Sequence, residues 1–271
     1  MKLAVSNIAW PAELDAAVLA FLAANGIGAI EVAPTRVWPH WKGFNPTSVR
    51  EFRRVVESSG LRISSLQSIL FQKPELSLFG SDEDRQAMEE HLHRCADLAA
   101  DLGAGCMVFG APRNRDRGAL PEARAFAIAA EFFARVGEYG AKRDVCLGFE
   151  ANPVEYKCSF ATDSGTAARL VRAVGSEGSR LHLDTACLHL AGEDAARAIR
   201  ENADILRHFH ASEPYLAGFS APVAAHREAA AALRSVHYDQ WVALEMRAGD
   251  PPLPALEEAV RFVRRIYGDC D

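Results

Sequence analysis

The sequence predicts one (β/α)₈ TIM barrel domain spanning residues 1–271. Short apolar runs alternate with longer amphipathic segments along the whole chain, which is the pattern of repeated βα units. The length of 271 residues suits such a barrel, which needs about 250. No Pro/Ser-rich or low-complexity tract marks a domain boundary. An open, doubly wound sheet is the alternative architecture.

Eight apolar runs of strand length are expected to form the barrel. In chain order they are Leu3–Ile8, Ala29–Val32, Arg62–Gln67, Cys106–Phe109, Val145–Glu150, Leu181–Asp184, Leu206–His210 and Val242–Glu245. The helices are expected near residues 12–25, 46–59, 82–101, 120–142, 164–174, 194–202, 223–235 and 254–267.

Helix boundaries follow from proline and glycine. Pro46 and Pro254 stand where the first turn of a helix tolerates proline. Gly26, Gly60 and Gly103 are typical of helix C-terminal stops before the next strand. The third helix carries an apolar stripe with a period near 3.6, as expected for a helix that covers a sheet. Its members are Met88, Leu92, Cys95, Leu98 and Leu102.

Composition restricts the function classes. A net charge of −6 and a pI near 5.9 argue against a nucleic-acid partner, which would normally require a basic face. No apolar stretch is long enough to span a membrane, and the N-terminus lacks the layout of a signal peptide. The six cysteines are scattered without a CxxC pair, which fits reduced thiols in a cytoplasmic protein.

Four polar residues close the last four apolar runs. They are Glu150, Asp184, His210 and Glu245, and each gap between them fits one strand plus one helix. In a parallel barrel these side chains would gather at one rim, where the chemistry of such barrels is found. Neighbouring buried carboxylates repel one another unless a cation balances them. An oxygen-rich set with one imidazole therefore predicts a divalent cation such as Mn²⁺, Mg²⁺ or Co²⁺.

Four short motifs carry a family resemblance that extends over essentially the whole chain. They are Phe149-Glu-Ala-Asn-Pro153, Leu183-Asp-Thr185, His208-Phe-His-Ala-Ser-Glu-Pro214 and Ala243-Leu-Glu-Met-Arg247. With these motifs the sequence resembles the xylose-isomerase-like TIM barrels, the sugar (phosphate) isomerase/epimerase group that includes an AP endonuclease branch. The resemblance implies that Glu150, Asp184, His210 and Glu245 bind Mn²⁺, with Mg²⁺, Co²⁺ or Zn²⁺ as alternatives. It also implies that Glu150 and Glu245 are the acid/base pair on either side of the substrate carbon.

The chain departs from this family pattern at several positions. Many relatives place a histidine three residues after the metal aspartate, where this chain has Cys187; His189 lies two residues further on. The hydrolytic branch needs three zinc ions and extra histidines. Here Gln67 occupies one such position, and no Asp-x-His pair follows His210. DNA repair is therefore not expected.

Further residues near the expected rim are candidates for substrate contact, each with ordinary packing or solvation as the alternative. The main candidates are His182, Arg247, His189 and Trp38. Asn152 and Glu213 are candidate hydrogen-bond partners of the ligands, and His208 shares a strand face with His210. The expected rim cations are Arg36, Lys42, Arg113 and Arg115.

These expectations combine into a mechanism. A dication bound to a carbonyl and the neighbouring hydroxyl oxygen stabilises an enediolate, while one glutamate removes a proton and a second returns it. The predicted function is metal-dependent isomerisation or epimerisation of a small sugar, ketose or polyol. A metal-dependent lyase or dehydratase of a keto-sugar or polyol is the alternative, and a non-catalytic metal-binding barrel is a third. No Gly-rich phosphate loop implies a nucleotide cofactor, and homo-oligomer formation is left open.

Overall fold

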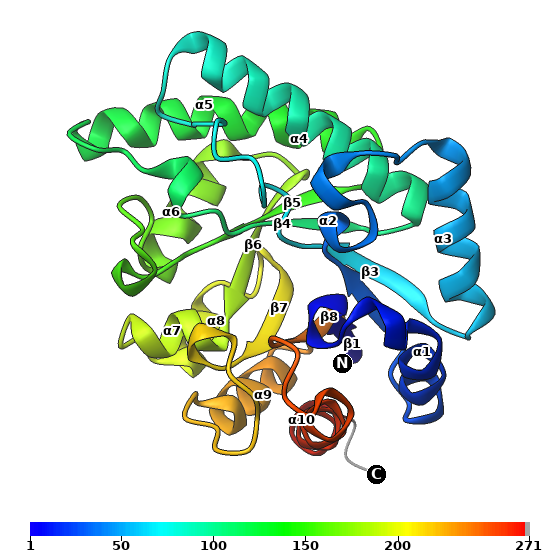
Figure 1. The fold of residues 1–271 in the computed structure, drawn as a ribbon. Helices are drawn as coiled ribbons and strands as arrows, with labels where there is room; N and C mark the ends of the chain where they lie inside the picture. Colours follow the sequence, from blue (N-terminus) through cyan, green and yellow to red (C-terminus); the bar gives the residue numbers. More distant parts are fainter. Residues whose placement is uncertain (269–271) are drawn as a thin grey trace.

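A computed structural model describes residues 1–268. Eight parallel strands close into a barrel in chain order, and the helices surround it (Figure 1). The predicted (β/α)₈ barrel is confirmed. The strands are β1 Lys2–Ser6, β2 Ala29–Val32, β3 Arg62–Leu66, β4 Cys106–Phe109, β5 Cys146–Glu150, β6 Ser179–Asp184, β7 Leu206–Ser212 and β8 Trp241–Glu245.

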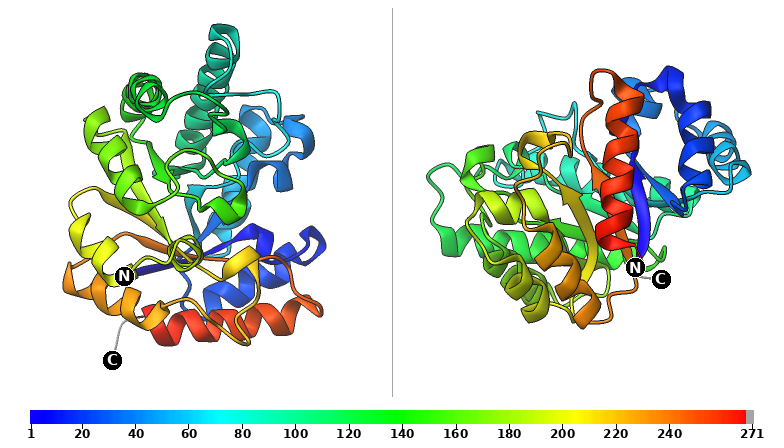
Figure 2. Two further views of the ribbon diagram at one scale, coloured as in Figure 1. Left: turned by 90° about the vertical axis from the view of Figure 1, so that its left-hand side faces the viewer. Right: turned by 90° about the horizontal axis from the view of Figure 1, so that it is seen from below.

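Within residues 1–268, ten α-helices follow the strands, some as short extra turns in the loops. They are α1 Asp15–Ala24, α2 Pro34–Val37, α3 Pro46–Ser58, α4 Asp82–Leu102, α5 Glu122–Ala141, α6 Ser164–Val174, α7 Thr185–Leu190, α8 Ala195–Glu201, α9 His226–Ser235 and α10 Pro252–Tyr267. The ring closes where β8 pairs with β1, and α10 packs along β1 at this seam (Figure 2).

Local chemistry sets the ends of the long helices. Asn45 begins α3 with a capping box, in which its side chain accepts from Ser48 N and the Ser48 hydroxyl accepts from Asn45 N. Ser81 and Asp84 form the same arrangement at α4. The α4 helix ends at Gly103, whose φ of 76° is the left-handed conformation that glycine adopts without strain.

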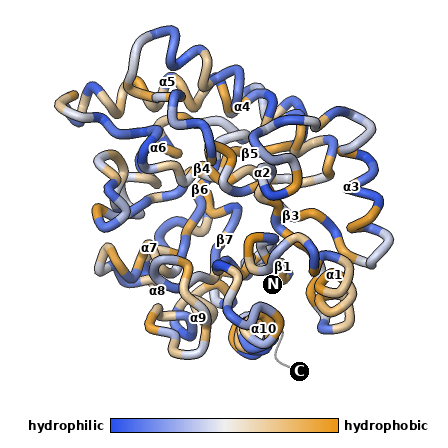
Figure 3. Tube along the Cα trace, viewed as in Figure 1, coloured by the Kyte–Doolittle hydropathy of each residue, from blue (hydrophilic) through white to orange (hydrophobic). Residues whose placement is uncertain are grey.

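The core lies between the strands and the inner faces of the helices. Phe133 of α5 packs edge-on against Phe109 of β4 and Phe149 of β5, with ring centroids 5.0 and 5.1 Å apart. All three rings are almost fully buried. In Figure 3 the outer helices alternate between hydrophobic and hydrophilic residues, as expected for helices with one face on the barrel.

The structure differs from the expected elements mainly near the carboxyl ends of the strands. The first strand ends at Ser6 because Asn7–Ala9 turns into a 3₁₀ helix. The seventh strand runs on to Ser212. Two short helices, α2 and α7, were not predicted; the second begins directly after Asp184, whose side chain caps it. The five described cysteines are free and buried, and Cys270 lies outside the described residues. Within residues 1–268 no helix is long and apolar enough to cross a bilayer.

Candidate metal centre and cavity

A cavity of about 730 Å³ opens at the carboxyl end of the barrel. Its floor includes the four strand-end residues predicted from the sequence, Glu150, Asp184, His210 and Glu245. Its walls come from the loops after β3 to β8. The cavity therefore lies at the rim where such barrels carry their chemistry.

Strand register brings the four residues together. Glu150, Asp184 and Glu245 are the last residues of β5, β6 and β8. Asp184 is the register partner of His210 on β7, and Glu245 pairs two residues further along that strand. The Asp184 carboxylate is fixed by Cys187 N, which donates to Oδ1 at 2.7 Å, and by the Ser212 hydroxyl, which donates to Oδ2 at 2.6 Å.

His210 points one ring nitrogen at the carboxylates. Its Nδ1 lies 3.2 Å from Glu245 Oε2 and 3.7 Å from Asp184 Oδ2. This nitrogen is buried and has no hydrogen-bond partner among the described residues. A buried ring nitrogen without a partner, next to carboxylate oxygens, is the arrangement that a dication would satisfy.

The other donors are close enough to share one ion. Ligand atoms of Glu150, His182, Asp184 and His210 all lie within 4.8 Å of one another. Glu245 adjoins this group through His210. The side chains are nearly inaccessible to solvent, with Asp184 and His210 only 3% and 2% exposed. The donor set thus fits a divalent cation that prefers oxygen and imidazole ligands.

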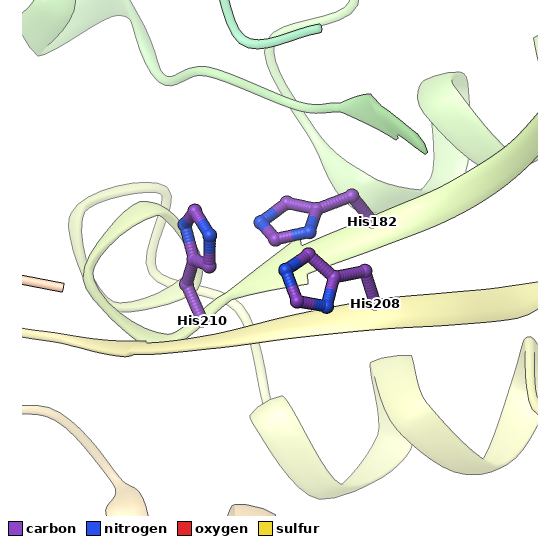
Figure 4. Close-up of side chains that lie close together, drawn as sticks. All are labelled: His182, His208 and His210. Carbon is purple, nitrogen blue, oxygen red and sulfur yellow. The ribbon is translucent and has the colours of Figure 1, made fainter. Parts of the chain in front are cut away.

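Glu31, in the middle of β2, is a candidate functional residue that the sequence pattern did not reveal. It is completely buried, and its Oε1 lies 2.9 Å from His210 Nε2. Its Oε2 lies 2.7 Å from His208 Nε2 and accepts the Ser65 hydroxyl at 2.7 Å. His182, His208 and His210 gather beside one another on β6 and β7 (Figure 4). An acid inside the apolar run Ala29–Val32 was the available signal.

Burial and mutual repulsion raise the pKa values of Glu150 and Glu245 in the metal-free protein. Burial, followed by the charge of Asp184, raises the pKa of Glu150 to about 8. Burial also raises the pKa of Glu245. Burial opposes protonation of His210, but the charges of Glu31 and Glu245 outweigh it and raise the His210 pKa well above its usual value. The site therefore holds protons that a dication would displace.

Arg115 is completely buried behind Glu150, although the sequence suggested a rim cation. Its guanidinium donates to the Glu150 backbone carbonyl at 2.7 Å and to Asn152 Oδ1 at 3.0 Å. The same group lies 4.9 Å from the centre of the Phe149 ring. No ion pair of the described residues includes Arg115, so it fixes the end of β5 through neutral acceptors. Arg36, in the loop after β2, pairs with Asp15 and does not line the cavity in the described chain.

Cys187 takes part in the cavity wall at the position where many relatives carry histidine. Its Sγ lies 3.8 Å from Glu150 Oε1 and 3.6 Å from Asn152 Nδ2. The thiol is 7% exposed, and burial raises its pKa well above the usual value. A neutral thiol thus stands beside the carboxylate of Glu150.

The four predicted substrate contacts occupy different places. Arg247 is exposed and lines the cavity. The other three do not line it within the described chain. His182 is fully buried beneath the carboxylates, His189 is exposed on α7, and Trp38 packs edge-on against Phe52 with ring centroids 5.6 Å apart. Gln67 does line the cavity, and its amide donates to the Ser6 hydroxyl at 2.6 Å.

Comparison with known proteins agrees with this architecture. The family model described as xylose isomerase-like TIM barrel matches residues 19–266. Among curated protein sequences, none matches the chain significantly.

Solved structures share the fold across the whole chain. A D-psicose 3-epimerase from Clostridium cellulolyticum, solved with D-tagatose, is 13% identical, with a TM-score of 0.82 and 100% of both chains covered. A 3-keto-D-glucoside 4-epimerase from E. coli is 14% identical, with a TM-score of 0.78, covering 98% of this chain and 99% of that one. A probable 3-DHS dehydratase from Bacillus anthracis is 15% identical, with a TM-score of 0.74, covering 97% and 98%. At these identities the likeness establishes the fold alone.

Proposed function

The chain belongs to the xylose isomerase-like TIM barrel family, and from this premise we propose that it is a divalent-metal-dependent isomerase or epimerase of a small sugar, ketose or polyol. The observation that supports the proposal is the convergence of Glu150, Asp184, His210 and Glu245 on one cavity. The ketose and keto-glycoside epimerases among the structural neighbours favour the same substrate class.

The four residues would hold the cation, with His210 binding through Nδ1. Glu31 accepts at Nε2 and so leaves the Nδ1 lone pair free for the ion. When bound, the ion would polarise the substrate carbonyl and stabilise the negative charge of an enediolate. We expect Mn²⁺ first, with Mg²⁺, Co²⁺ and Zn²⁺ as alternatives.

Glu150 and Glu245 are proposed to carry the proton. They reach the cavity from β5 and β8, which are separated in the ring by β6 and β7. A substrate carbon between them would face one carboxylate on each side. One glutamate takes the proton and the other returns it, either to the same carbon with inversion or to the neighbouring carbon. The first outcome is epimerisation and the second is aldose–ketose isomerisation.

A lyase or dehydratase is the second candidate, favoured by the neighbour described as a probable 3-DHS dehydratase. It would begin with the same proton removal and then expel a β-hydroxyl group. The products distinguish the two reactions. Incorporation of solvent deuterium without loss of water indicates epimerisation or isomerisation, whereas loss of water indicates the lyase.

The test is an NMR screen of ketoses and inososes in D₂O with the Mn²⁺-loaded protein. Changing Glu245→Gln keeps a ligand oxygen but removes the base, so turnover should fall by at least about 10²-fold. The control is Glu89→Gln, which alters an acid on the outer helix α4 that pairs with Arg135. Unchanged turnover in Glu245→Gln would assign the proton transfer to another residue. Exchange that persists after turnover stops would make Glu150 the base that removes the proton.

Metal binding has its own test. Elemental analysis after mild purification should find a divalent metal in the wild-type protein and much less in Asp184→Ala, which loses one ligand. Equal occupancy in both proteins would remove the proposed centre.

A further inference from the structure

The charged residues that line the cavity are segregated. All three acids, Glu150, Asp184 and Glu245, stand at strand ends on the floor. The three cations, Lys73, Arg113 and Arg247, stand on the loops after β3, β4 and β8. A ligand that stands on the floor would therefore meet carboxylates at the strand ends and cations on the surrounding loops.

The loops that carry Lys73 and Arg113 are held together by the buried side chain of Asn114, which is only 7% exposed. Its Nδ2 donates to Lys73 O at 2.8 Å and to Leu76 O at 2.7 Å. Its backbone carbonyl accepts from Leu78 N at 2.8 Å. The backbones of Lys73 and Arg113 are thus fixed beside one another before any ligand binds.

The same loop is held from its outer side. His91 Nε2 lies 2.8 Å from Ile69 O, and Trp41 Nε1 donates to Phe71 O at 2.9 Å. Arg247 is also fixed at its backbone, because its N–H donates to Leu216 O at 3.0 Å. Cations on anchored backbones lose less conformational entropy when they bind a ligand.

These cations have little internal compensation. Neither Arg113 nor Arg247 takes part in an ion pair among residues 1–268. Lys73 Nζ lies 3.5 Å from the carboxylate of Glu75, whose side chain is 59% exposed. An exposed pair of this kind contributes little.

The charge balance of the cavity changes when the metal binds. Among the lining side chains the three carboxylates and three cations cancel, so a bound dication would leave two positive charges in excess, of which the buried Glu31 carboxylate beside His210 would offset one. This excess occurs in a chain whose net charge is −6. A neutral sugar would leave the excess to solvent, whereas an acidic group could accept charge-assisted hydrogen bonds from the cations.

The cavity is also larger than one sugar head group requires. Its volume of about 730 Å³ lies in the range that holds drug-sized ligands, and it extends from Glu150 to Lys73. We propose that the substrate carries an acidic group, a phosphate or a carboxylate, at the end away from the reacting carbon, and that Lys73, Arg113 and Arg247 bind this group. The proposal rests on the proposed function, because it assumes that the reacting end lies at the metal.

The test compares three ligands that share one ketose head: D-fructose, D-fructose 6-phosphate and D-fructuronate. Isothermal calorimetry on the Mn²⁺-loaded protein should show that at least one acidic ligand binds about tenfold more tightly than D-fructose. The preferred acid identifies phosphate or carboxylate as the group. The preference should weaken as ionic strength rises.

Substitutions test whether the three cations cause the preference for the acidic ligand. Arg247→Met and the double change Lys73→Met/Arg113→Met should each remove most of it without changing the affinity for D-fructose. Lys42→Met is the matched control, since Lys42 is an exposed cation in the loop after β2 and does not line the cavity in the described chain. The Lys42→Met variant should prefer the acidic ligand as strongly as the wild type does. Thermal unfolding of each variant should confirm that it is folded.

The proposal would be overturned if the acidic ligands bound no more tightly than D-fructose. Failure of all three ligands to bind would overturn it as well. So would a preference that survives in the triple variant Lys73→Met/Arg113→Met/Arg247→Met. Failure of the proposed function looks different: an acid-dependent affinity would persist, but no ligand would exchange deuterium with solvent.

Discussion

Glu31 contacts His210 of the candidate metal centre and is absent from the cavity lining of the described chain. Its carboxylate contacts the ring nitrogen of His210 that faces away from the other acids. A carboxylate at this position fixes the orientation of the ring and keeps the proton on Nε2. The Nδ1 nitrogen then keeps its lone pair for a metal ion. Contacts with His208 and Ser65 hold Glu31 itself in place.

We predict that Glu31→Gln weakens Mn²⁺ binding by about 10- to 100-fold, the range typical for loss of such a partner. The amide keeps the shape of the side chain but loses the charge that orients His210. Titration of free Mn²⁺ followed by electron paramagnetic resonance measures the affinity, with Glu89→Gln as the control on α4. Wild-type affinity in Glu31→Gln would show that Glu31 only fills space.

At the level of single residues, the sequence predicted those candidate site residues that stand at the ends of strands. Glu150, Asp184, His210 and Glu245 each close an apolar run, and their convergence follows from a parallel barrel. Glu31 could not be found this way, because its partners His208 and His210 are 177 and 179 positions away along the chain. Arg115 was misjudged for a similar reason: only the packed loop shows that Phe149 and Asn152 enclose it.

Among the elements, the loop between β4 and α5 controls the end of β5. Through Arg115 it holds the Glu150 carbonyl, and through Asn114 it holds the loop after β3. One segment thus holds Glu150, a candidate metal ligand, on one side and the loop that carries Lys73 on the other.

Replacing Arg115 should therefore destabilise the protein. Arg115→Met leaves the Glu150 carbonyl and Asn152 Oδ1 without their donor, at a cost of about 1–3 kcal/mol for each buried acceptor. Urea unfolding monitored by circular dichroism measures the loss. The matched control is Arg117→Met, because Arg117 binds the carbonyls of Ser159 and Leu120 from a half-buried position where water can replace it. Equal losses in both variants would contradict a special role for Arg115.

The eight strands and the main helices could be predicted because hydrophobic period and capping residues are local signals. The short helices α2 and α7 could not. Each is a turn in a loop at the active rim, and α7 depends on Asp184 serving both as its cap and as a candidate ligand. Short elements of this kind are decided by tertiary contacts rather than by periodicity.

For the whole molecule, the raised pKa of Glu150 links stability to pH. Its pKa is about 8 in the folded metal-free protein and about 4.3 in an unfolded chain. The unfolded state therefore binds fewer protons than the folded state between these values, so stability falls as pH rises through this window. The raised pKa of Glu245 acts in the same direction.

We predict that the metal-free protein melts at a lower temperature at pH 8 than at pH 6, and that Glu150→Gln reduces this difference. Saturating Mn²⁺ should raise the melting temperature more at pH 8, where fewer protons compete for the ligands. Differential scanning calorimetry at the two pH values, with and without the metal, measures both effects. The same pH difference in wild type and Glu150→Gln would exclude Glu150 as its source.

The seam between β8 and β1 has a consequence for biosynthesis. Glu245 belongs to the last of the eight strands, which pairs with β7 on one side and with β1 on the other. A nascent chain that has left the ribosome only as far as β7 already has Glu150, Asp184 and His210, but it has neither Glu245 nor a closed ring. With the proposed ligand set, the complete cation site would form only after β8 has been translated and has paired with β7 and β1.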